Sequence, residues 1–326
     1  MGNVFLAGWT ASSSNIASGG HLNSFAGGNA DAYLVKFNSS GSRLWGTYYG
    51  GSGDDNYFND GNIVSTDANG NVYLFGTTKS TTGISASGFQ NTLNGNSDAF
   101  IVKFNPNGSR LWGTYYGGAG GETGKSIIND ANGNIYIVGS ASNLTTTEVT
   151  STGFNNTTGN GYIAKFDSVC NRIWGRKYEL IGNGVDLDAN GNIYITGSID
   201  STINLNAGGY QSSYGGGATD AALAKFDNSG NLIGATYFGG IGSDKGNVLL
   251  VDQTSNVYMT GTTSSPANIA NGGFQNVYGG GTNGDVYIAK FSSCAFFGPQ
   301  ITPQSITVCP GQNTTLSISG GLSIIS

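Results

Sequence analysis

The chain has 326 residues and a formal net charge of −6, and only 10% of its residues are charged. Nucleic-acid binding depends on a basic stripe that displaces counterions from phosphates, so this composition excludes it. It also excludes a polybasic membrane anchor, and no apolar run reaches the length that spans a bilayer. Glycine is abundant, at 56 residues, beside 17 tyrosines and 16 phenylalanines. Glycine-rich turns between short apolar runs are typical of an all-β protein.

In chain order, the first predicted element is a short apolar strand at residues 2–8, Gly-Asn-Val-Phe-Leu-Ala-Gly. This start lacks the basic region and the long apolar core of a signal peptide, so we expect the chain to begin inside a longer repeat array. The same pattern returns four times, at residues 70–76, 133–139, 191–197 and 255–261. The period is roughly 60 residues, which indicates tandem repeats of one supersecondary unit.

Each period contains four strand candidates, named A to D in chain order. Strand A is the segment that ends at residues 127–130, and strand B is the apolar segment described above. Strand C occupies residues 98–104, with copies at 31–37, 220–226 and 285–291, and strand D occupies residues 110–116, with a copy at 43–49. Strands B and C are apolar on both faces, which predicts a sheet that is covered on both sides.

The connections predict antiparallel pairing within each period. Strand A joins strand B through Asp67-Ala68-Asn69-Gly70-Asn71, and Asn-Gly is a strong hairpin signal because both positions favour a positive φ. Strand C joins strand D through Asn105-Pro106-Asn107-Gly108 or a similar turn. We therefore predict an all-β fold, a β-propeller of about five four-stranded antiparallel blades.

The predicted blades lie near residues 1–53, 54–118, 119–180, 181–240 and 241–295. The first period lacks strand A and the last lacks an evident strand D, so the end blades are expected to be incomplete. Such open edges predict an open fragment of a larger ring. Residues 296–326 are interpreted as a linker and the beginning of an immunoglobulin-like module.

Four motifs resemble the bacterial SBBP-type β-propeller repeat. They are residues 67–76, Gly88-Phe89-Gln90-Asn91, residues 98–104 and residues 112–118, and they recur in a fixed order from Gly2 to about Phe291. The resemblance implies a secreted or surface-exposed bacterial protein, often followed by immunoglobulin-like or PKD-like modules and often exported by type IX secretion. It implies no defined activity.

The Asp-x-Asn-x-Asn spacing of Asp67, Asn69 and Asn71 suggests a calcium loop. A loop of the EF-hand type needs glycine at its sixth position and a late acidic ligand, but Val72 holds the sixth position and Leu74 and Phe75 follow. We therefore interpret the motif as a hairpin turn and predict no metal or cofactor.

His21 is the single histidine, and it aligns with aromatic residues of the other periods. The aligned residues are Phe89, Phe154, Tyr210 and Phe274. A repeated aromatic at this position predicts a side chain that packs the B–C loop onto its own blade, not a catalytic base. Trp45, Trp112 and Trp174 also occupy equivalent positions, in strand D, and we expect them to pack between blades in preference to stacking on sugar rings.

An aspartate recurs at the start of strand C, and a lysine recurs near its end. Those at its start are Asp31, Asp98, Asp220 and Asp285, and those near its end are Lys36, Lys103, Lys165, Lys225 and Lys290. A residue that recurs in each blade serves the blade, so we assign these residues to strand-end hydrogen bonds and local charge pairing. The best unrepeated acids are Asp54, Asp55, Asp60 and Asp186, and none of them lies in a recognisable catalytic motif.

The three cysteines do not form a zinc motif. Cys170 and Cys294 fall in equivalent C–D turns of different blades, too far apart for a disulfide, which needs Cα atoms within about 7 Å. Cys309 belongs to the expected C-terminal module.

Two hypotheses of function follow. The favoured one is a non-enzymatic secreted or cell-surface scaffold that binds an extracellular glycan, another polymer or a protein through long polar B–C loops, such as residues 80–97 and 264–283, projecting from one rim. No catalytic residue is assigned under it. The alternative is a polysaccharide-active hydrolase or lyase whose unrepeated acids meet in the central channel.

Overall fold

The structure is a computed structural model, and it describes residues 2–55, 63–142, 160–200, 205, 209–281 and 284–292. Within these ranges the chain forms five antiparallel sheets and contains no helix. Residues 293–326 lie outside the described ranges, and so does the expected immunoglobulin-like module.

Each sheet is one blade and takes its strands in chain order. Blade 1 consists of β1 (Val4–Thr10), β2 (Asp31–Phe37) and β3 (Arg43–Tyr49). Blade 2 consists of β4 (Val64–Thr66), β5 (Val72–Thr78), β6 (Asp98–Phe104) and β7 (Arg110–Tyr116). Blade 3 consists of β8 (Glu122–Asn129), β9 (Ile135–Ala141), β10 (Gly161–Phe166) and β11 (Arg172–Tyr178). Blade 4 consists of β12 (Ile181–Leu187), β13 (Ile193–Ile199), β14 (Asp220–Phe226) and β15 (Leu232–Phe238). Blade 5 consists of β16 (Asp244–Val251), β17 (Val257–Thr263) and β18 (Asp285–Phe291).

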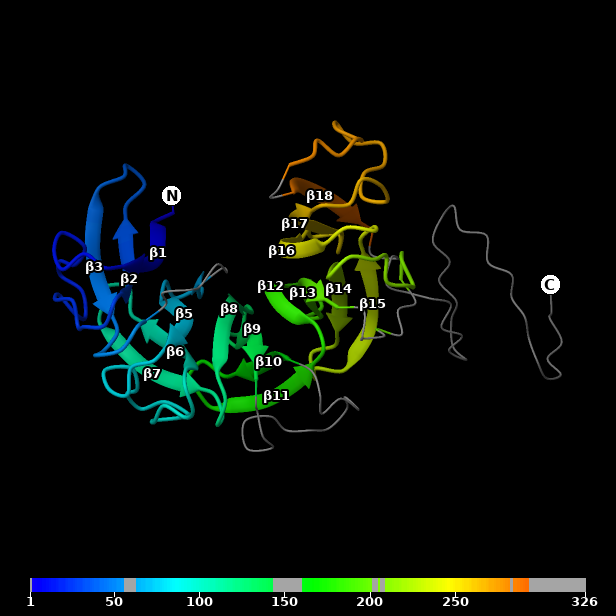
Figure 1. The fold of residues 1–326 in the computed structure, drawn as a ribbon. Coiled ribbons are helices and arrows are strands. Elements are labelled where there is room, and N and C mark those ends of the chain that lie inside the picture. The colour runs from blue at the N-terminus through cyan, green and yellow to red at the C-terminus, as the bar shows by residue number, and fades with distance from the viewer. Residues whose placement is uncertain are drawn as a thin grey trace.

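The five blades are arranged side by side along an open arc (Figure 1). Strands β8, β12 and β16 lie on the inner side of the arc, and β3, β7, β11 and β15 lie on its outer side. Among the described residues blade 1 has no strand A and blade 5 has no strand D. The predicted all-β propeller with incomplete end blades is therefore confirmed.

The A–B turns adopt the conformation that their glycines predict. Gly70, Gly133 and Gly191 have φ values of 76°, 81° and 78°, in the left-handed region that a side chain disfavours. In each turn an aspartate closes the loop: Asp67 Oδ1 accepts hydrogen bonds from the backbone N–H groups of Asn69 and Asn71. The Asp67 carboxylate thus serves the hairpin turn, as predicted.

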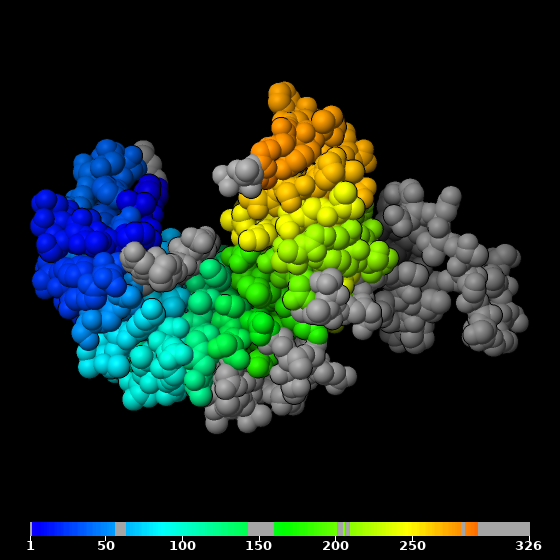
Figure 2. Space-filling view, viewed as in Figure 1, coloured from blue at the N-terminus to red at the C-terminus, as the bar shows by residue number. Residues whose placement is uncertain are grey.

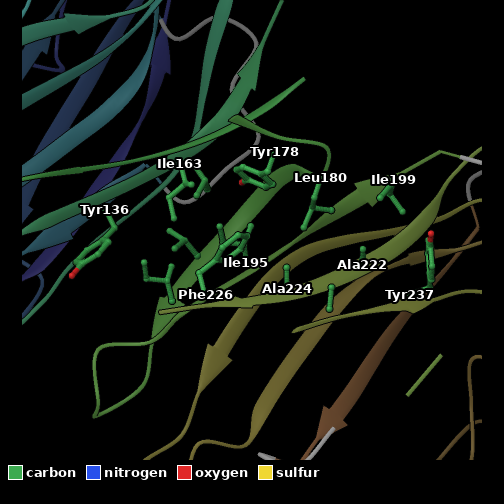
Figure 3. Close-up of a cluster of buried hydrophobic side chains, with 14 of the residues drawn as sticks. Tyr136, Ile163, Tyr178, Leu180, Ile195, Ile199, Ala222, Ala224, Phe226 and Tyr237 are labelled. Carbon is green, nitrogen blue, oxygen red and sulfur yellow. The ribbon is translucent and has the colours of Figure 1, made fainter. Parts of the chain in front are cut away.

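The hydrophobic core lies between the blades, not within any one of them. One cluster joins Tyr136, Ile163 and Tyr178 of blade 3 to Ile195 and Phe226 of blade 4 (Figure 3). Equivalent clusters join the other three pairs of consecutive blades. Strand β6 is buried at all seven positions because blades 1 and 3 cover its two faces, as its apolar sequence predicts.

Candidate functional site

A lysine and a tryptophan of each of blades 1 to 3 hydrogen-bond to the C–D turn of the next blade. In blade 1, Lys36 Nζ and Trp45 Nε1 both donate to the backbone oxygen of Pro106, over 2.8 and 3.0 Å. In blade 2, Lys103 and Trp112 donate in the same way to the backbone oxygen of Ser168. We call this arrangement the latch.

The latch repeats at the junction of blades 3 and 4. Trp174 Nε1 donates to the backbone oxygen of Asn228, and Lys165 Nζ donates to the side-chain oxygen of the same residue. The tryptophans therefore pack between blades, as predicted. Gly234 stands at the tryptophan position in blade 4.

The latch lysine is also held within its own blade. Lys103 Nζ lies 3.4 Å from Asp67 Oδ2 and 5.0 Å from the centre of the Tyr73 ring. Lys225 has the same relationship with Asp188 and Tyr194. The predicted charge pairing thus involves the lysine and the turn aspartate, at the end of the blade opposite to the strand-C aspartate.

The aspartate at the start of strand C meets a second acid from the next blade. Asp31 Oδ1 and Asp55 Oδ2 would lie 2.6 and 2.5 Å from a Cβ atom built on Gly50. Both carboxylates are fully buried. Asp55 accepts hydrogen bonds from Gly51 N, Thr78 Oγ1 and Ser80 Oγ. Asp31 Oδ2 accepts one from the backbone N–H of Ala26, whereas within the described residues Asp31 Oδ1 has no donor.

Two more junctions hold such an acid pair. Asp98 and Glu122 both lie beside Gly117, and Asp220 and Asp244 both lie beside Gly239. Glu122 accepts a hydrogen bond from Gly118 N, as Asp55 does from Gly51 N. Asp55 was predicted to be unrepeated, and this is wrong: Asp55, Glu122 and Asp244 occupy the same position of the repeat.

The junction of blades 3 and 4 lacks both acids. Asn160 stands at the strand-C position, and the connection from Tyr178 to Gly182 is shorter than the connection from Tyr116 to Gly124 that carries Glu122.

Burial raises the pKa of Asp31, Asp55 and Asp220. Desolvation, reinforced by the negative charge of Asp55, raises the pKa of Asp31 to about 6. Desolvation and the charge of Asp244 raise the pKa of Asp220 to about 6. Burial also raises the pKa of Asp55, although hydrogen bonds from Thr78 and Gly51 oppose the shift. In these two pairs the negative charge of the partner acid opposes ionisation of the strand-C aspartate.

The other unrepeated acids do not join this cluster. Asp54 accepts a hydrogen bond from Asn29 N and lies 3.9 Å from Lys79 Nζ, near the surface. Asp186 lies on β12 and accepts hydrogen bonds from Leu187 N and from Val251 N of blade 5. Asp60 lies outside the described residues. Asp54 thus lies at the junction of blades 1 and 2, whereas Asp186 lies at the junction of blades 4 and 5.

The B–C loop aromatics of blades 1, 2 and 4 contact the next blade, which was not predicted, and His21 also lies 6.5 Å from the Tyr49 ring of its own blade, as predicted. The ring of Phe89 lies 5.9 Å from that of Phe166 in blade 3, and the Arg172 guanidinium lies 4.8 Å from the Phe89 ring centre. His21 occupies the same position of the repeat, with its ring 6.2 Å from that of Phe104 in blade 2. Burial and the positive charge of Arg110 lower the pKa of His21. Phe154 lies outside the described residues.

The B–C loops of blades 1, 2 and 4 fold back along strand D of their own blade instead of projecting from the rim. In blade 2 the backbones of Ala86 and Gly113 exchange two hydrogen bonds, and Tyr115 N donates to Gln90 O. In blade 1 Ser18 and Gly46 exchange the equivalent pair. The loop thus covers the outer edge of the blade, which would otherwise expose unpaired backbone groups. Sequence reasoning missed this pairing, since the loop has no strand pattern.

Cys170 is a buried turn residue. It has a φ of 74° and takes the place that Gly108 and Gly230 hold in other C–D turns. Burial raises the pKa of its thiol to about 11, so the reactive thiolate is scarce at neutral pH. Cys294 and Cys309 lie outside the described residues. Across the described ranges, no three His, Cys, Asp or Glu side chains come together as a metal site would require.

Two segments of this chain are similar to a β-propeller repeat family. The model of the SBBP β-propeller repeat matches residues 174–203 and 233–269. An uncharacterised WD repeat-containing protein of Acanthamoeba polyphaga mimivirus is 26% identical over 205 residues, and the match covers 52% of this chain and 14% of the viral protein.

Two solved structures align at low similarity. One, of a protein of unknown function from Bacteroides caccae, has a TM-score of 0.40 and 8% identity, and the alignment covers 71% of this chain and 61% of that chain. The other, of a β-xylosidase/α-arabinofuranosidase from a compost microbial metagenome, has a TM-score of 0.33 and 11% identity, with coverages of 89% and 87%. The described residues of this chain include no helix long and apolar enough to cross a membrane.

Proposed function

We propose that this β-propeller is a non-enzymatic scaffold of a secreted or cell-surface protein and that it binds neutral polysaccharide along its outer rim. The observation that carries the proposal is the pairing of the B–C loops with strand D. Backbone hydrogen bonds at Ala86 and Gln90 hold the loop of blade 2 in a fixed position. Because the loop backbone is already fixed, ligand binding costs little further loss of backbone entropy.

The chemistry of these loops favours an uncharged ligand rich in hydroxyl groups. Between residues 79 and 97 the single charged residue is Lys79, and residues 11–30 contain no Asp, Glu, Lys or Arg. Thr81, Thr82, Asn91 and Thr92 are exposed on the loop of blade 2. Hydroxyl and amide groups both donate and accept hydrogen bonds, as sugar hydroxyls do.

The positions of the acids support a role without catalysis. Hydrolysis of a glycosidic bond uses two carboxylates that face the substrate. Asp31 and Asp55 are fully buried, and Asp55 accepts its hydrogen bonds from Gly51, Thr78 and Ser80. These acids support the junction between two blades.

Screening of the full chain on an array of neutral polysaccharides tests the proposal. The loop variant Thr81→Ala/Asn91→Ala/Thr92→Ala is expected to lose binding. The matched control is Asn69→Ala/Asn107→Ala/Asn132→Ala, which changes exposed amides in turns at the opposite end of the strands. Equal binding by the two variants, or no binding by the unchanged chain, would contradict the proposal. Release of new reducing ends from a bound polysaccharide would favour the hydrolase alternative.

A further inference from the structure

The B–C loops of blades 2 and 4 each hold an aromatic ring that is anchored at a blade junction and still exposed. Phe89 contacts Phe166 of blade 3, and Tyr210 contacts Phe291 of blade 5, with ring centres 5.9 and 6.3 Å apart. Both receiving rings are buried, whereas 39% of the surface of Phe89 and 66% of that of Tyr210 are accessible. A ring that served only to join two blades would be more stabilising if it were buried.

The backbone on both sides of Phe89 is fixed against strand D of its own blade. Before the ring, a Cβ atom built on Gly88 would collide with the backbone oxygen of Gly113, so this position requires glycine. After the ring, Gln90 N donates a hydrogen bond to Thr114 Oγ1 over 2.8 Å. The loop therefore presents the Phe89 ring in a set position before any ligand binds.

The same backbone contact recurs in the other described loops of this kind. In blade 4 the residue after Tyr210, Gln211, donates from its backbone N–H to Thr236 Oγ1 over 2.8 Å. In blade 1 Leu22 N donates to Thr47 Oγ1 over the same distance. Loops with different sequences thus hold their ring-bearing residue at one position relative to strand D, which lowers the entropic cost of binding at that ring.

The chemistry around the rings fits a neutral sugar with a flat apolar face. Residues 80–97 and 201–219, which carry Phe89 and Tyr210, contain no Asp, Glu, Lys or Arg. The face of an aromatic ring carries negative partial charge. A β-linked glucose unit turns axial C–H bonds of positive partial charge toward such a face, while its equatorial hydroxyl groups point sideways to the polar loop. The Arg172 guanidinium lies 4.8 Å from the centre of the Phe89 ring and adds hydrogen-bond donors of its own at that platform.

We propose that Phe89 and Tyr210 are platforms on which glucose units of a neutral β-linked glucan stack, so that one polysaccharide chain crosses several blade junctions. The inference rests on the proposed function and narrows its ligand to a polymer with flat apolar sugar faces. Consecutive blades follow one another without a break on the visible outer side of the arc, from blue at blade 1 to cyan at blade 2 (Figure 2). A chain that already contacts one ring binds the second at a high effective concentration, so two modest contacts give a much higher affinity together.

Isothermal titration calorimetry of the full chain with a soluble mixed-linkage β-glucan tests this inference. Phe89→Ala and Tyr210→Ala are each expected to raise the dissociation constant about fivefold, which is the size of one aromatic contact. The double variant is expected to raise it about 25-fold, because effects at distant sites add in free energy. Tyr210→Phe keeps the ring and is expected to recover most of the affinity that Tyr210→Ala loses.

The matched control is Val169→Ala. Val169 is 65% exposed, but it lies in the C–D turn of blade 3, away from the B–C loops, so its variant is expected to bind like the unchanged chain. Thermal unfolding verifies that each variant is folded. Tyr210→Trp gives a second measurement, since the fluorescence emission of the new tryptophan should shift to shorter wavelength when the β-glucan covers it.

Unchanged affinity in the folded double variant would overturn the inference and leave the proposed function standing. The same conclusion follows if the unchanged chain binds another neutral polysaccharide on the array but not the β-glucan. Equal losses in Tyr210→Phe and Tyr210→Ala would also overturn it, because the hydroxyl group and not the ring would then make the contact. Failure of the unchanged chain to bind any neutral polysaccharide would overturn the inference and the proposed function together.

Discussion

Asp31 and Asp55 come from consecutive blades and direct their carboxylates to the same point beside Gly50. The pair recurs as Asp220 and Asp244 beside Gly239, where a built Cβ atom would lie 2.7 and 2.8 Å from the two carboxylate oxygens. Two buried acids this close cannot both ionise without cost. The junctions that contain Asp31 and Asp220 are therefore expected to respond to pH.

Mild acid is expected to stabilise the protein. The pKa of Asp31 and of Asp220 rises from 3.8 to about 6 in the folded state, so the folded state binds protons more tightly than the unfolded chain. Stability is then gained as the pH falls through 6, and the gain levels off below 3.8. Between pH 7 and 5 each acid contributes about 1 kcal/mol to the free energy of unfolding. Urea unfolding at pH 7, 6 and 5 measures this gain.

The control for this prediction is the double variant Asp31→Asn/Asp220→Asn. It introduces asparagine, the residue that blade 3 has at the equivalent position, Asn160. It should lose most of the dependence on pH between 7 and 5. His21, whose pKa is lowered by folding, acts in the opposite direction below pH 6.5, so a small loss of stability in acid is expected to remain. A gain in acid that persists in the double variant would show that other groups are responsible.

Gly50→Ala is expected to destabilise the junction of blades 1 and 2. The new methyl group would lie within 2.6 Å of the Asp31 and Asp55 carboxylates, and both are buried. Overpacking of this kind costs about 2 kcal/mol. Gly273→Ala is the control, since no atom lies closer than 3.9 Å to its built Cβ atom. Thermal unfolding of both variants measures the difference, and equal melting temperatures would be inconsistent with a tight packing of the acid pair.

Lys103→Met tests the latch. The substitution removes the hydrogen bond to Ser168 O and leaves Asp67 without the cation 3.4 Å away. Breaking a buried pair from one side costs about 3 kcal/mol. Lys79→Met serves as the comparison, because Lys79 is half-exposed and lies 3.9 Å from Asp54. An exposed pair of this kind contributes less than about 1 kcal/mol. Urea unfolding measures the free energy of unfolding of both variants, and Lys103→Met is expected to lose more of it than Lys79→Met. Similar losses in the two variants would argue against a structural role for the latch.

Phe89→Ala and Phe274→Ala change the same position of the repeat in two environments. Phe89 packs against Phe166 and Arg172, so its loss is expected to cost about 1 kcal/mol. Phe274 is fully exposed, and its loss should change the free energy of unfolding by less than about 0.5 kcal/mol. The two values come from parallel urea titrations. A larger effect at Phe274 would mean that blade 5 is covered in solution.

The strands and turns of this fold could be predicted because their signals are local. Asp67 and Gly70 lie in one turn, and the apolar pattern of residues 98–104 describes a strand covered on both faces. The fold class follows once such signals recur at a fixed period. The open ends could also be predicted, because the sequence has no strand A pattern before residues 2–8 and no evident strand D pattern after residues 285–291, and among the described residues no such strand is present.

The junctions could not be predicted in the same way. Lys36 and Pro106 are 70 residues apart, and no local pattern states that a lysine reaches the turn of the next blade. The acid pair did have a signal that was missed. Gly50-Gly51, Gly117-Gly118 and Gly239-Gly240 are each followed by an acid four positions after the second glycine. Alignment on these glycines identifies Asp55, Glu122 and Asp244 as one position.

The acceptor of the latch tryptophan is a main-chain oxygen at all three junctions where the contact is described, on Pro106, Ser168 and Asn228. Residues with three unlike side chains therefore offer the same main-chain acceptor to this donor. Evolutionary drift at this turn position leaves the tryptophan contact intact. A copied period would therefore find an acceptor for its tryptophan whichever residue stands at this turn position.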